Sequence, residues 1–214
     1  MQLDICEIFF SLQGESTYAG LPCVFVRLSG CNLNCSYCDT IYAKTESSPM
    51  NSDDIIKNIE SYECNLVEIT GGEPLLQANT AILISRLINN NYNVLLETNG
   101  SISLQDIHSK CIKIVDIKCP SSNESQNNLK ENLKYLTPQD ELKFVLGTKE
   151  DYDFAKAFIL REKLNIASEK IHFSPVFDTL KPETLAGWIL DDGLSVRMSL
   201  QMHKLIWDKD KRGI

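Results

Sequence analysis

Residues 24–38 read Val-Phe-Val-Arg-Leu-Ser-Gly-Cys-Asn-Leu-Asn-Cys-Ser-Tyr-Cys, an apolar run followed at once by a group of three cysteines. The β-branched and aromatic run over residues 24–28 is typical of a buried strand, and Ser29 and Gly30 mark its end. The cysteines are therefore expected in a loop at the carboxyl end of a strand. In parallel α/β folds, binding and catalytic residues gather at this end of the strands.

Outward from this stretch, short apolar runs alternate with longer amphipathic ones. The apolar runs predict strands over residues 24–28, 66–70, 94–98, 112–117, 142–146, 171–174 and 195–200. The amphipathic runs predict helices over residues 53–62, 80–90, 129–136, 149–163 and 182–190. This alternation predicts an α/β fold with mostly parallel strands and right-handed crossovers. Because a full eight-unit barrel takes about 250 residues, a chain of 214 residues predicts an incomplete, TIM-type (β/α)6-like partial barrel.

Local signals agree with these elements. Ser52, followed by Asp53 and Asp54, predicts a helix N-cap with acids in the first turn, and Asn79 predicts the next N-cap. Pro182 stands where a first-turn proline is tolerated.

Polar segments follow three of the predicted strands directly, over residues 29–40, 70–74 and 97–100. Since carboxyl ends of parallel strands share one edge of the sheet, we expect these segments to meet at one site.

Composition narrows the class of protein. The 21 Lys and Arg against 29 Asp and Glu give a net charge of -8, which repels polyanions, so nucleic acid is not an expected partner. No run of about 18 apolar residues exists, and residues 1–10 lack the basic flank and cleavage site of a signal peptide. We therefore expect a soluble, cytoplasmic protein without a membrane span, forming a single domain over residues 1–214.

Eight cysteines in an intracellular chain indicate metal binding or catalysis before disulfides. Iron–sulfur clusters are ordinarily held by four thiolates, so the loop of Cys31, Cys35 and Cys38 would leave one iron open to another ligand. The alternative is a structural zinc site, which needs a fourth thiolate or imidazole. The other cysteines are not spaced as metal-ligand pairs. Neither are the histidines, which we expect to be structural: His108, His172 and His203.

The CxxxCxxC spacing with an aromatic residue before the last cysteine resembles the cluster loop of radical S-adenosylmethionine enzymes. The resemblance implies a 4Fe-4S cluster on Cys31, Cys35 and Cys38, whose open iron chelates S-adenosylmethionine. Reductive cleavage then gives methionine and a 5′-deoxyadenosyl radical. A second resemblance lies in Gly-Gly-Glu-Pro at residues 71–74, where glycines let the backbone approach a ligand closely. It implies that Gly72 and Glu73 bind the amino group of S-adenosylmethionine.

Other segments closely resemble the 7-carboxy-7-deazaguanine synthase family. They are Ile-Phe-Phe-Ser-Leu-Gln-Gly-Glu-Ser at residues 8–16, Gly-Leu-Pro at 20–22, Phe-Val-Arg-Leu at 25–28 and Cys-Asp-Thr at 38–40. Looser matches extend through residues 97–100 to residues 199–204. The family converts 6-carboxy-5,6,7,8-tetrahydropterin to 7-carboxy-7-deazaguanine with loss of ammonia, a ring contraction in queuosine and 7-deazapurine biosynthesis. It uses S-adenosylmethionine catalytically and requires Mg²⁺.

The resemblance implies roles for individual residues, and no catalytic side chain is expected because the cofactor supplies the radical. Arg27 can form a bidentate pair with the substrate carboxylate, although a surface or interface ion pair is its alternative. Thr40 is implied as the Mg²⁺ ligand, which fits the preference of Mg²⁺ for a few protein oxygens plus water. The other implied substrate contacts are Leu12, Gln13, Gly14 and Thr70. The other implied S-adenosylmethionine contacts are Tyr37, Cys38, Asp39, Lys118, Cys119, Pro120, Ser174, Pro175 and Val176.

Two other functions remain open from the sequence. A glycyl-radical-enzyme activase shares the cluster loop and the short barrel but would not need Gln13 and Arg27. A non-catalytic metal-binding protein would hold zinc without iron. The expected partners are a second copy in a homodimer, a small pterin and a low-potential electron donor such as flavodoxin. Family members can end with a proline whose carboxylate reaches the substrate, and Ile214 departs from that pattern.

Overall fold

The computed structural model describes residues 1–209 and 211–214 and contains a nine-stranded sheet in the order β3-β1-β2-β4-β5-β6-β7-β8-β9. From β2 to β9 the neighbouring strands are parallel, while β1 is antiparallel to both β2 and β3. The sheet is open, so the expected α/β partial barrel is confirmed. Its strands are β1 (Gln2–Leu12), β2 (Pro22–Leu28), β3 (Ser48–Asn51), β4 (Leu66–Gly71), β5 (Asn93–Thr98), β6 (Ile112–Asp116), β7 (Glu141–Leu146), β8 (Ile171–Pro175) and β9 (Arg197–Met198).

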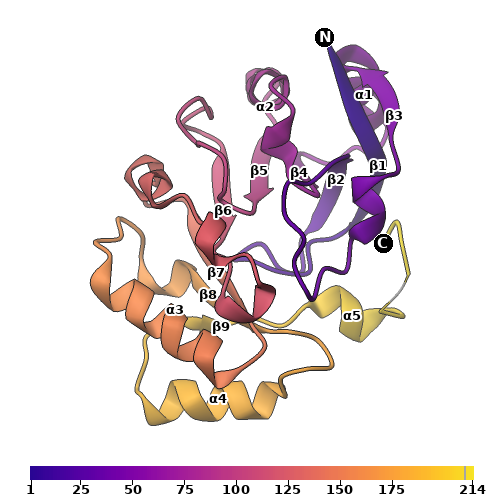
Figure 1. Ribbon diagram of the computed structural model, residues 1–214. Coiled ribbons are helices and arrows are strands. Elements are labelled where there is room, and N and C mark those ends of the chain that lie inside the picture. The colour runs from indigo at the N-terminus through magenta and orange to yellow at the C-terminus, as the bar shows by residue number, and fades with distance from the viewer. Residues whose placement is uncertain (210) are drawn as a thin grey trace.

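Helices α1 to α4 lie around the outside of the curved sheet, whereas α5 lies apart from them (Figure 1). The α-helices are α1 (Ser52–Glu60), α2 (Thr80–Asn89), α3 (Lys149–Arg161), α4 (Pro182–Asp191) and α5 (Met202–Ile206). Short 3-10 helices cover Ile41–Lys44, Pro74–Leu76, Pro120–Ser122, Ser125–Asn127, Lys130–Tyr135 and Ser168–Lys170. Among the described residues, none of the helices combines the length and the apolar composition needed to cross a bilayer.

All seven predicted strands are present, but β1, β3 and α5 were not predicted. In β1 the pairing register shifts between Ile5 and Glu7, and this bulge interrupts the alternation that identifies a strand. β3 is a short edge strand that contains Pro49, where a missing N–H costs no ladder bond.

The helix expected over residues 129–136 is a 3-10 helix instead. The side chain of its central residue, the buried Asn132, donates to the carbonyls of Gly100 and Ile102 and accepts from the Leu104 N–H. These hydrogen bonds to the preceding segment hold the residues in a 3-10 helix, which is longer per residue and more tightly wound than an α-helix.

One of the two predicted helix N-caps is wrong. Asn51, and not Ser52, caps α1, because the Asn51 side chain accepts from the N–H groups of Asp53 and Asp54. Asn79 does occupy the N-cap of α2, but its amide donates to the Gln2 carbonyl at 2.9 Å and makes no cap bond.

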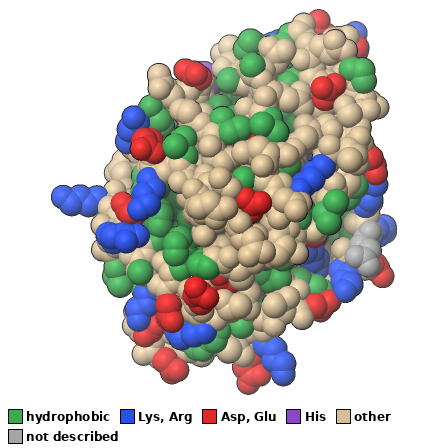
Figure 2. Space-filling model, in the orientation of Figure 1, with side chains coloured by type: hydrophobic (Ala, Val, Ile, Leu, Met, Phe, Trp, Pro, Cys, Tyr) green, Lys and Arg blue, Asp and Glu red, His purple; other side chains and the backbone are tan. Residues whose placement is uncertain are grey.

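The two faces of the sheet differ in chemistry. The outer face is apolar and packs under the helices through buried residues such as Val26, Ile69, Leu96 and Leu142. The inner face is apolar only near the amino ends of the strands, where Phe25 stacks on Phe9 at 4.9 Å. Toward the carboxyl ends several inward positions are polar, among them Thr70, Glu97 and Lys143. Elsewhere, charged side chains of both signs are interspersed over the surface in view (Figure 2).

Close packing between the ends of β2 and β4 requires glycine. A Cβ on Gly71 would lie 2.4 Å from the Leu28 carbonyl oxygen, and one on Gly72 would lie 2.4 Å from the Gly30 carbonyl oxygen. These contacts are with backbone atoms that cannot rotate away.

We predict that Gly71→Ala lowers the free energy of unfolding by about 1–3 kcal/mol, because the two strand ends must separate. Urea unfolding of the apoprotein measures this. The matched control is Gly187→Ala in α4, where a Cβ would meet no described atom within 4 Å. It should raise stability by about 0.5–1 kcal/mol. Equal midpoints for Gly71→Ala and the unmodified protein would contradict the prediction.

Candidate functional site

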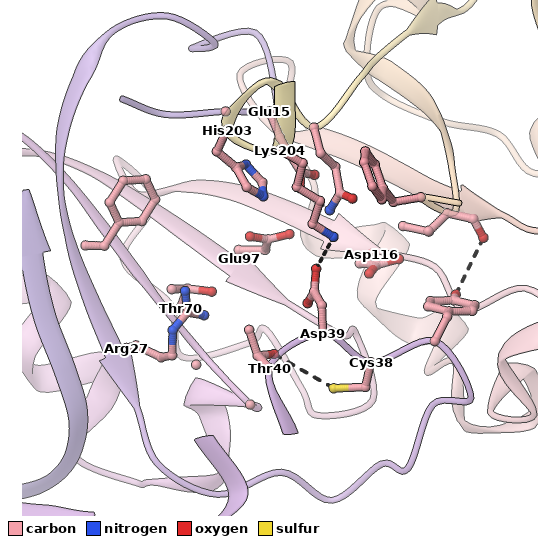
Figure 3. Close-up of a pocket in the computed structure, with 18 of the residues that line it drawn as sticks. Glu15, Arg27, Cys38, Asp39, Thr40, Thr70, Glu97, Asp116, His203 and Lys204 are labelled. Atoms are coloured by element: carbon pink, nitrogen blue, oxygen red, sulfur yellow. Dashed lines mark hydrogen bonds and ion pairs between the residues drawn. The ribbon is translucent and has the colours of Figure 1, made fainter. Parts of the chain in front are cut away.

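A cavity of about 880 Å³ opens at the carboxyl ends of the parallel strands (Figure 3). Its volume falls in the range of sites that enclose small molecules. The three polar segments predicted to meet all contribute to its wall, through residues such as Cys38, Thr70 and Asn99. The structure therefore brings together the two sequence motifs and the predicted pterin set.

The three cysteines of the loop after β2 all line this cavity and are partly buried. The loop is held by bonds to its neighbours. Ser36 donates through its N–H to the Ser122 carbonyl and through its hydroxyl to the Ser121 carbonyl, at 3.1 and 2.6 Å. The Asn34 N–H donates to Glu124 at 2.6 Å. These bonds hold the loop with its three cysteines at the cavity wall.

The donor set fits an iron–sulfur cluster better than one ion. Among the residues that the structure describes, no three His, Cys, Asp or Glu side chains converge tightly enough to hold a single metal ion. A four-iron cluster takes its thiolates at separate irons, so three cysteines can hold three of them. Burial raises the pKa of the Cys31 and Cys35 thiols, so binding of iron would release protons.

The Gly-Gly-Glu-Pro segment lies directly against the cluster loop. The Glu73 N–H donates to the Gly30 carbonyl at 2.8 Å. The Glu73 carboxylate is fully buried and accepts from the Leu75 N–H, the Thr98 hydroxyl and the Asn99 N–H at 2.7–2.9 Å. Its side chain therefore joins the ends of β4 and β5 behind the wall, whereas Gly72 reaches the cavity surface.

The remaining residues predicted for S-adenosylmethionine divide into two groups. Tyr37, Cys38, Asp39, Lys118 and Val176 line the cavity. The Tyr37 hydroxyl donates to the Val145 carbonyl at 3.5 Å, and burial raises the pKa of this tyrosine. The side chains that do not line the cavity are those of Glu73, Cys119, Pro120, Ser174 and Pro175.

Ion pairs hold two of these lining residues, Lys118 and Asp39. Lys118 donates to Asp116 at 2.6 Å, while the other Asp116 carboxylate oxygen has no hydrogen-bond partner among the described residues. Lys204 donates to Asp39 at 2.6 Å (Figure 3). Although burial opposes ionisation, Lys204 holds the pKa of Asp39 below its ordinary value. Cys119 is a fully buried free thiol, as expected.

The predicted substrate residues gather on the wall nearest β1 and β2. Leu12, Gln13, Gly14 and Thr70 all line the cavity. The Gln13 amide oxygen accepts from the Glu15 N–H at 2.6 Å, and its nitrogen donates to Glu68. The amide therefore has a defined orientation.

Arg27 lines the same wall and already has a partner. Its Nε donates to Glu7 at 2.8 Å, and its guanidinium lies 5.8 Å from the centre of the Phe9 ring. Glu7 also accepts from the Tyr42 hydroxyl at 2.9 Å. An ion pair within the protein is therefore present. It is made by Nε and does not involve the two terminal guanidinium nitrogens. Thr40 lies nearby, with its hydroxyl 3.8 Å from the Cys38 sulfur.

Several lining residues were not predicted. Lys143 on β7 pairs with Glu97 on β5 at 2.7 Å and with Glu15, which also accepts from Gln201. Although burial opposes ionisation, Lys143 lowers the pKa of Glu15 to about 2. Glu97 and Lys143 occupy inward positions of strands whose outward positions are apolar, whereas Glu15 and Gln201 lie in loops. The signal that could have identified them is a charged residue recurring at period two inside an apolar strand.

The histidines differ from the prediction in one case. His172 is structural as expected, since it is buried between Glu141 and Ser199 at 2.7 Å from each. His203 was also expected to be structural, but it lines the cavity and packs closely against Gly14. Residues after β9 turn back into the site, which brings His203 and Lys204 over it (Figure 3). No local pattern reveals that return.

Comparison with known proteins agrees with this arrangement. A family model described as the radical SAM superfamily matches residues 25–117. The chain is 42% identical to a 7-carboxy-7-deazaguanine synthase of Koribacter versatilis, across 99% of this chain and 100% of that protein. It is 43% identical to one of Chlorobaculum tepidum, across 99% and 97% respectively. The crystal structure of QueE from Escherichia coli shares the fold, with a TM-score of 0.77 and 24% identity over 95% of each chain.

The fold neighbour supports the architecture, and the full-length sequence relatives establish the relationship. Both extend over nearly the whole chain, well beyond the two motifs. The chain therefore belongs to the 7-carboxy-7-deazaguanine synthase family, within the radical SAM superfamily.

Proposed function

We propose that this protein converts 6-carboxy-5,6,7,8-tetrahydropterin to 7-carboxy-7-deazaguanine with loss of ammonia. The observation that carries the proposal is the meeting of two sets in one cavity. The three-thiol loop lies on one wall, and Gln13, Arg27 and Thr70 lie on the wall beside β1 and β2. A glycyl-radical activase or a simple metal-binding protein would need only the first of these sets.

Membership of the superfamily implies a 4Fe-4S cluster and S-adenosylmethionine. When bound, these groups supply a 5′-deoxyadenosyl radical, and the protein positions the reactants and excludes competing reactions. Cys31, Cys35 and Cys38 would hold the cluster. Tyr37 and the backbone at Gly72 would hold S-adenosylmethionine beside it.

Hydrogen bonds to the Glu73 carboxylate hold the wall behind this position. Among the described residues, this carboxylate accepts hydrogen bonds from Leu75, Thr98 and Asn99. We propose that Glu73 serves the amino-group site by holding these strand ends, with its neighbours making the contact. Lys118, anchored by Asp116, brings a positive charge to the same wall.

Substrate recognition would use both backbone and side chains. A pterin has a planar donor and acceptor edge that needs a few fixed polar groups. The backbone at Leu12 and Gly14 and the oriented Gln13 amide supply them, and Thr70 adds a hydroxyl. The free nitrogens of Arg27 would pair with the substrate carboxylate.

We propose a Mg²⁺ ion at the Thr40 hydroxyl, which lies in the cavity beside Cys38 (Figure 3). Mg²⁺ takes few protein oxygens and keeps water or substrate oxygens, so one hydroxyl is a sufficient anchor. The ion would neutralise the substrate carboxylate together with Arg27. Asp39, fixed by Lys204, would orient its waters.

We also propose a homodimer, the commonest closed assembly, and a low-potential reductant such as flavodoxin. We further propose a cytoplasmic location, where thiols stay reduced and can serve as cluster ligands.

The direct test is anaerobic turnover of the reconstituted protein with the pterin and S-adenosylmethionine. We expect a product lighter than the pterin by one ammonia, detected by mass spectrometry, and a slower reaction when Mg²⁺ is chelated. An unchanged pterin would favour the activase function, and zinc without iron in the purified protein would favour a metal-binding one.

We predict that Cys31→Ala, Cys35→Ala and Cys38→Ala each abolish the cluster and turnover, because three thiolates are the whole protein contribution to it. Iron content and visible absorption of anaerobically prepared protein measure the loss. Cys64→Ala is the control, since its thiol lies against the Pro22 carbonyl at the opposite end of β2. A cluster retained in any of the first three variants would contradict the ligand assignment.

We predict that Arg27→Lys raises the KM for the pterin about 10- to 100-fold, since an ammonium cannot replace a planar, bidentate donor. The KM for S-adenosylmethionine should not change. Arg86→Lys is the control, because Arg86 pairs with Asp53 on the outer helices. If the pterin KM of Arg27→Lys equals that of the unmodified protein, Arg27 does not bind the carboxylate.

A further inference from the structure

Four ionisable side chains from different elements converge below the predicted substrate wall. Glu15 comes from the loop after β1, Glu68 from β4, Glu97 from β5 and Lys143 from β7, and all line the cavity. The Lys143 ammonium pairs with Glu15 and with Glu97. One ammonium thus faces a group of three carboxyls, which leaves Glu68 without a cation of its own in this cluster.

Glu68 is the most deeply buried of these three glutamates, with 1% of its surface exposed. It accepts a hydrogen bond from the Gln13 amide nitrogen, and Glu97 lies on the same inner face of the neighbouring strand β5. Two carboxyl groups can share a hydrogen bond only when one of them carries a proton. Because Glu97 has the Lys143 ammonium at 2.7 Å, its negative charge is stabilised, and the proton belongs on Glu68.

The surroundings of Glu68 support this assignment. The titratable groups that face it are Glu97, Glu15, Lys143 and Cys23. Burial first, and then Glu97, raises the pKa of Glu68 well above its ordinary value. The Cys23 thiol, itself buried, has a raised pKa and adds no charge.

We propose that Glu68 is a positioning residue that works as a neutral carboxylic acid. It donates to Glu97 and accepts from Gln13, so that the Gln13 amide meets the pterin in a single orientation. The opposite end of that amide is held by the Glu15 N–H at 2.6 Å. The identity of the substrate in this proposal rests on the proposed function; the protonation of Glu68 does not.

The kinetic test compares Glu68→Leu with Glu68→Gln. A leucine leaves the Gln13 donor unpaired, so the pterin KM should rise at least about tenfold while the KM for S-adenosylmethionine stays within about twofold. Glutamine can accept from Gln13 and donate to Glu97 as the protonated acid does. It should restore the pterin KM to within about threefold of the unmodified protein. A folded Glu68→Gln variant as impaired as Glu68→Leu would mean that Glu68 works as a carboxylate, and would overturn the proposal.

A second measurement needs no turnover. Infrared spectra of the apoprotein near neutral pH should show a protonated carboxylic acid band that disappears in Glu68→Gln. The control is Glu141→Gln, an equally buried acid on β7. Although burial opposes ionisation, bonds from His172 and Thr17 lower the pKa of Glu141, so its removal should leave the band intact.

The two measurements separate the possible failures. If the band is missing from the unmodified protein or survives in Glu68→Gln, the proposal is wrong whatever the substrate. If the band behaves as expected but the pterin is never consumed, the proposed function fails and the protonated Glu68 stands. If Glu68→Leu does not fold, the band and the pterin KM of Glu68→Gln still decide.

Discussion

The Lys143 ammonium lies inside the curve of the sheet with 7% of the residue exposed, between the carboxylates of Glu15 and Glu97. A buried charge is tolerated only when it is paired, because removing one partner leaves an uncompensated ion in a poorly solvated place. This pairing ties the loop after β1 to strands on the far side of the sheet. Since that loop also carries Gln13 and Gly14, the same electrostatic requirement places the predicted substrate contacts.

The loop after β1 also bridges the side that the open sheet leaves without strands. Thr17 donates through its N–H to Glu141 at the start of β7, and the Met202 N–H donates to the Gly14 carbonyl at 2.9 Å. Segments distant in sequence therefore complete the wall that a closed barrel would make with strands. The cavity is consequently built partly from irregular backbone, which can present N–H and C=O groups to a planar ligand.

Opposite this loop, the cluster and Gly-Gly-Glu-Pro segments form one packed unit. Gly71 and Gly72 allow the end of β4 to touch the end of β2, and Glu73 binds the last residue of β5, Thr98, and the next residue, Asn99. An acid in a binding motif thus has a structural task that sequence resemblance does not distinguish from ligand contact. Rigidity here would help to position the reactants when the cofactor that supplies the radical is bound.

Features of the fold and of the site were predictable where the interactions that cause them are local in sequence. Apolar runs located the seven parallel strands, since burial of the outer face imposes Val, Ile and Leu locally. The cysteine spacing and its place after a strand were equally local, so the sequence alone identified the candidate cluster loop. The bulge in β1 and the Asn132 contacts escaped prediction because partners far along the chain cause them. The same holds for the bond between Gln13 and Glu68 and for the return of His203: register and sheet curvature bring these residues together, and neither is encoded in any short stretch of the chain.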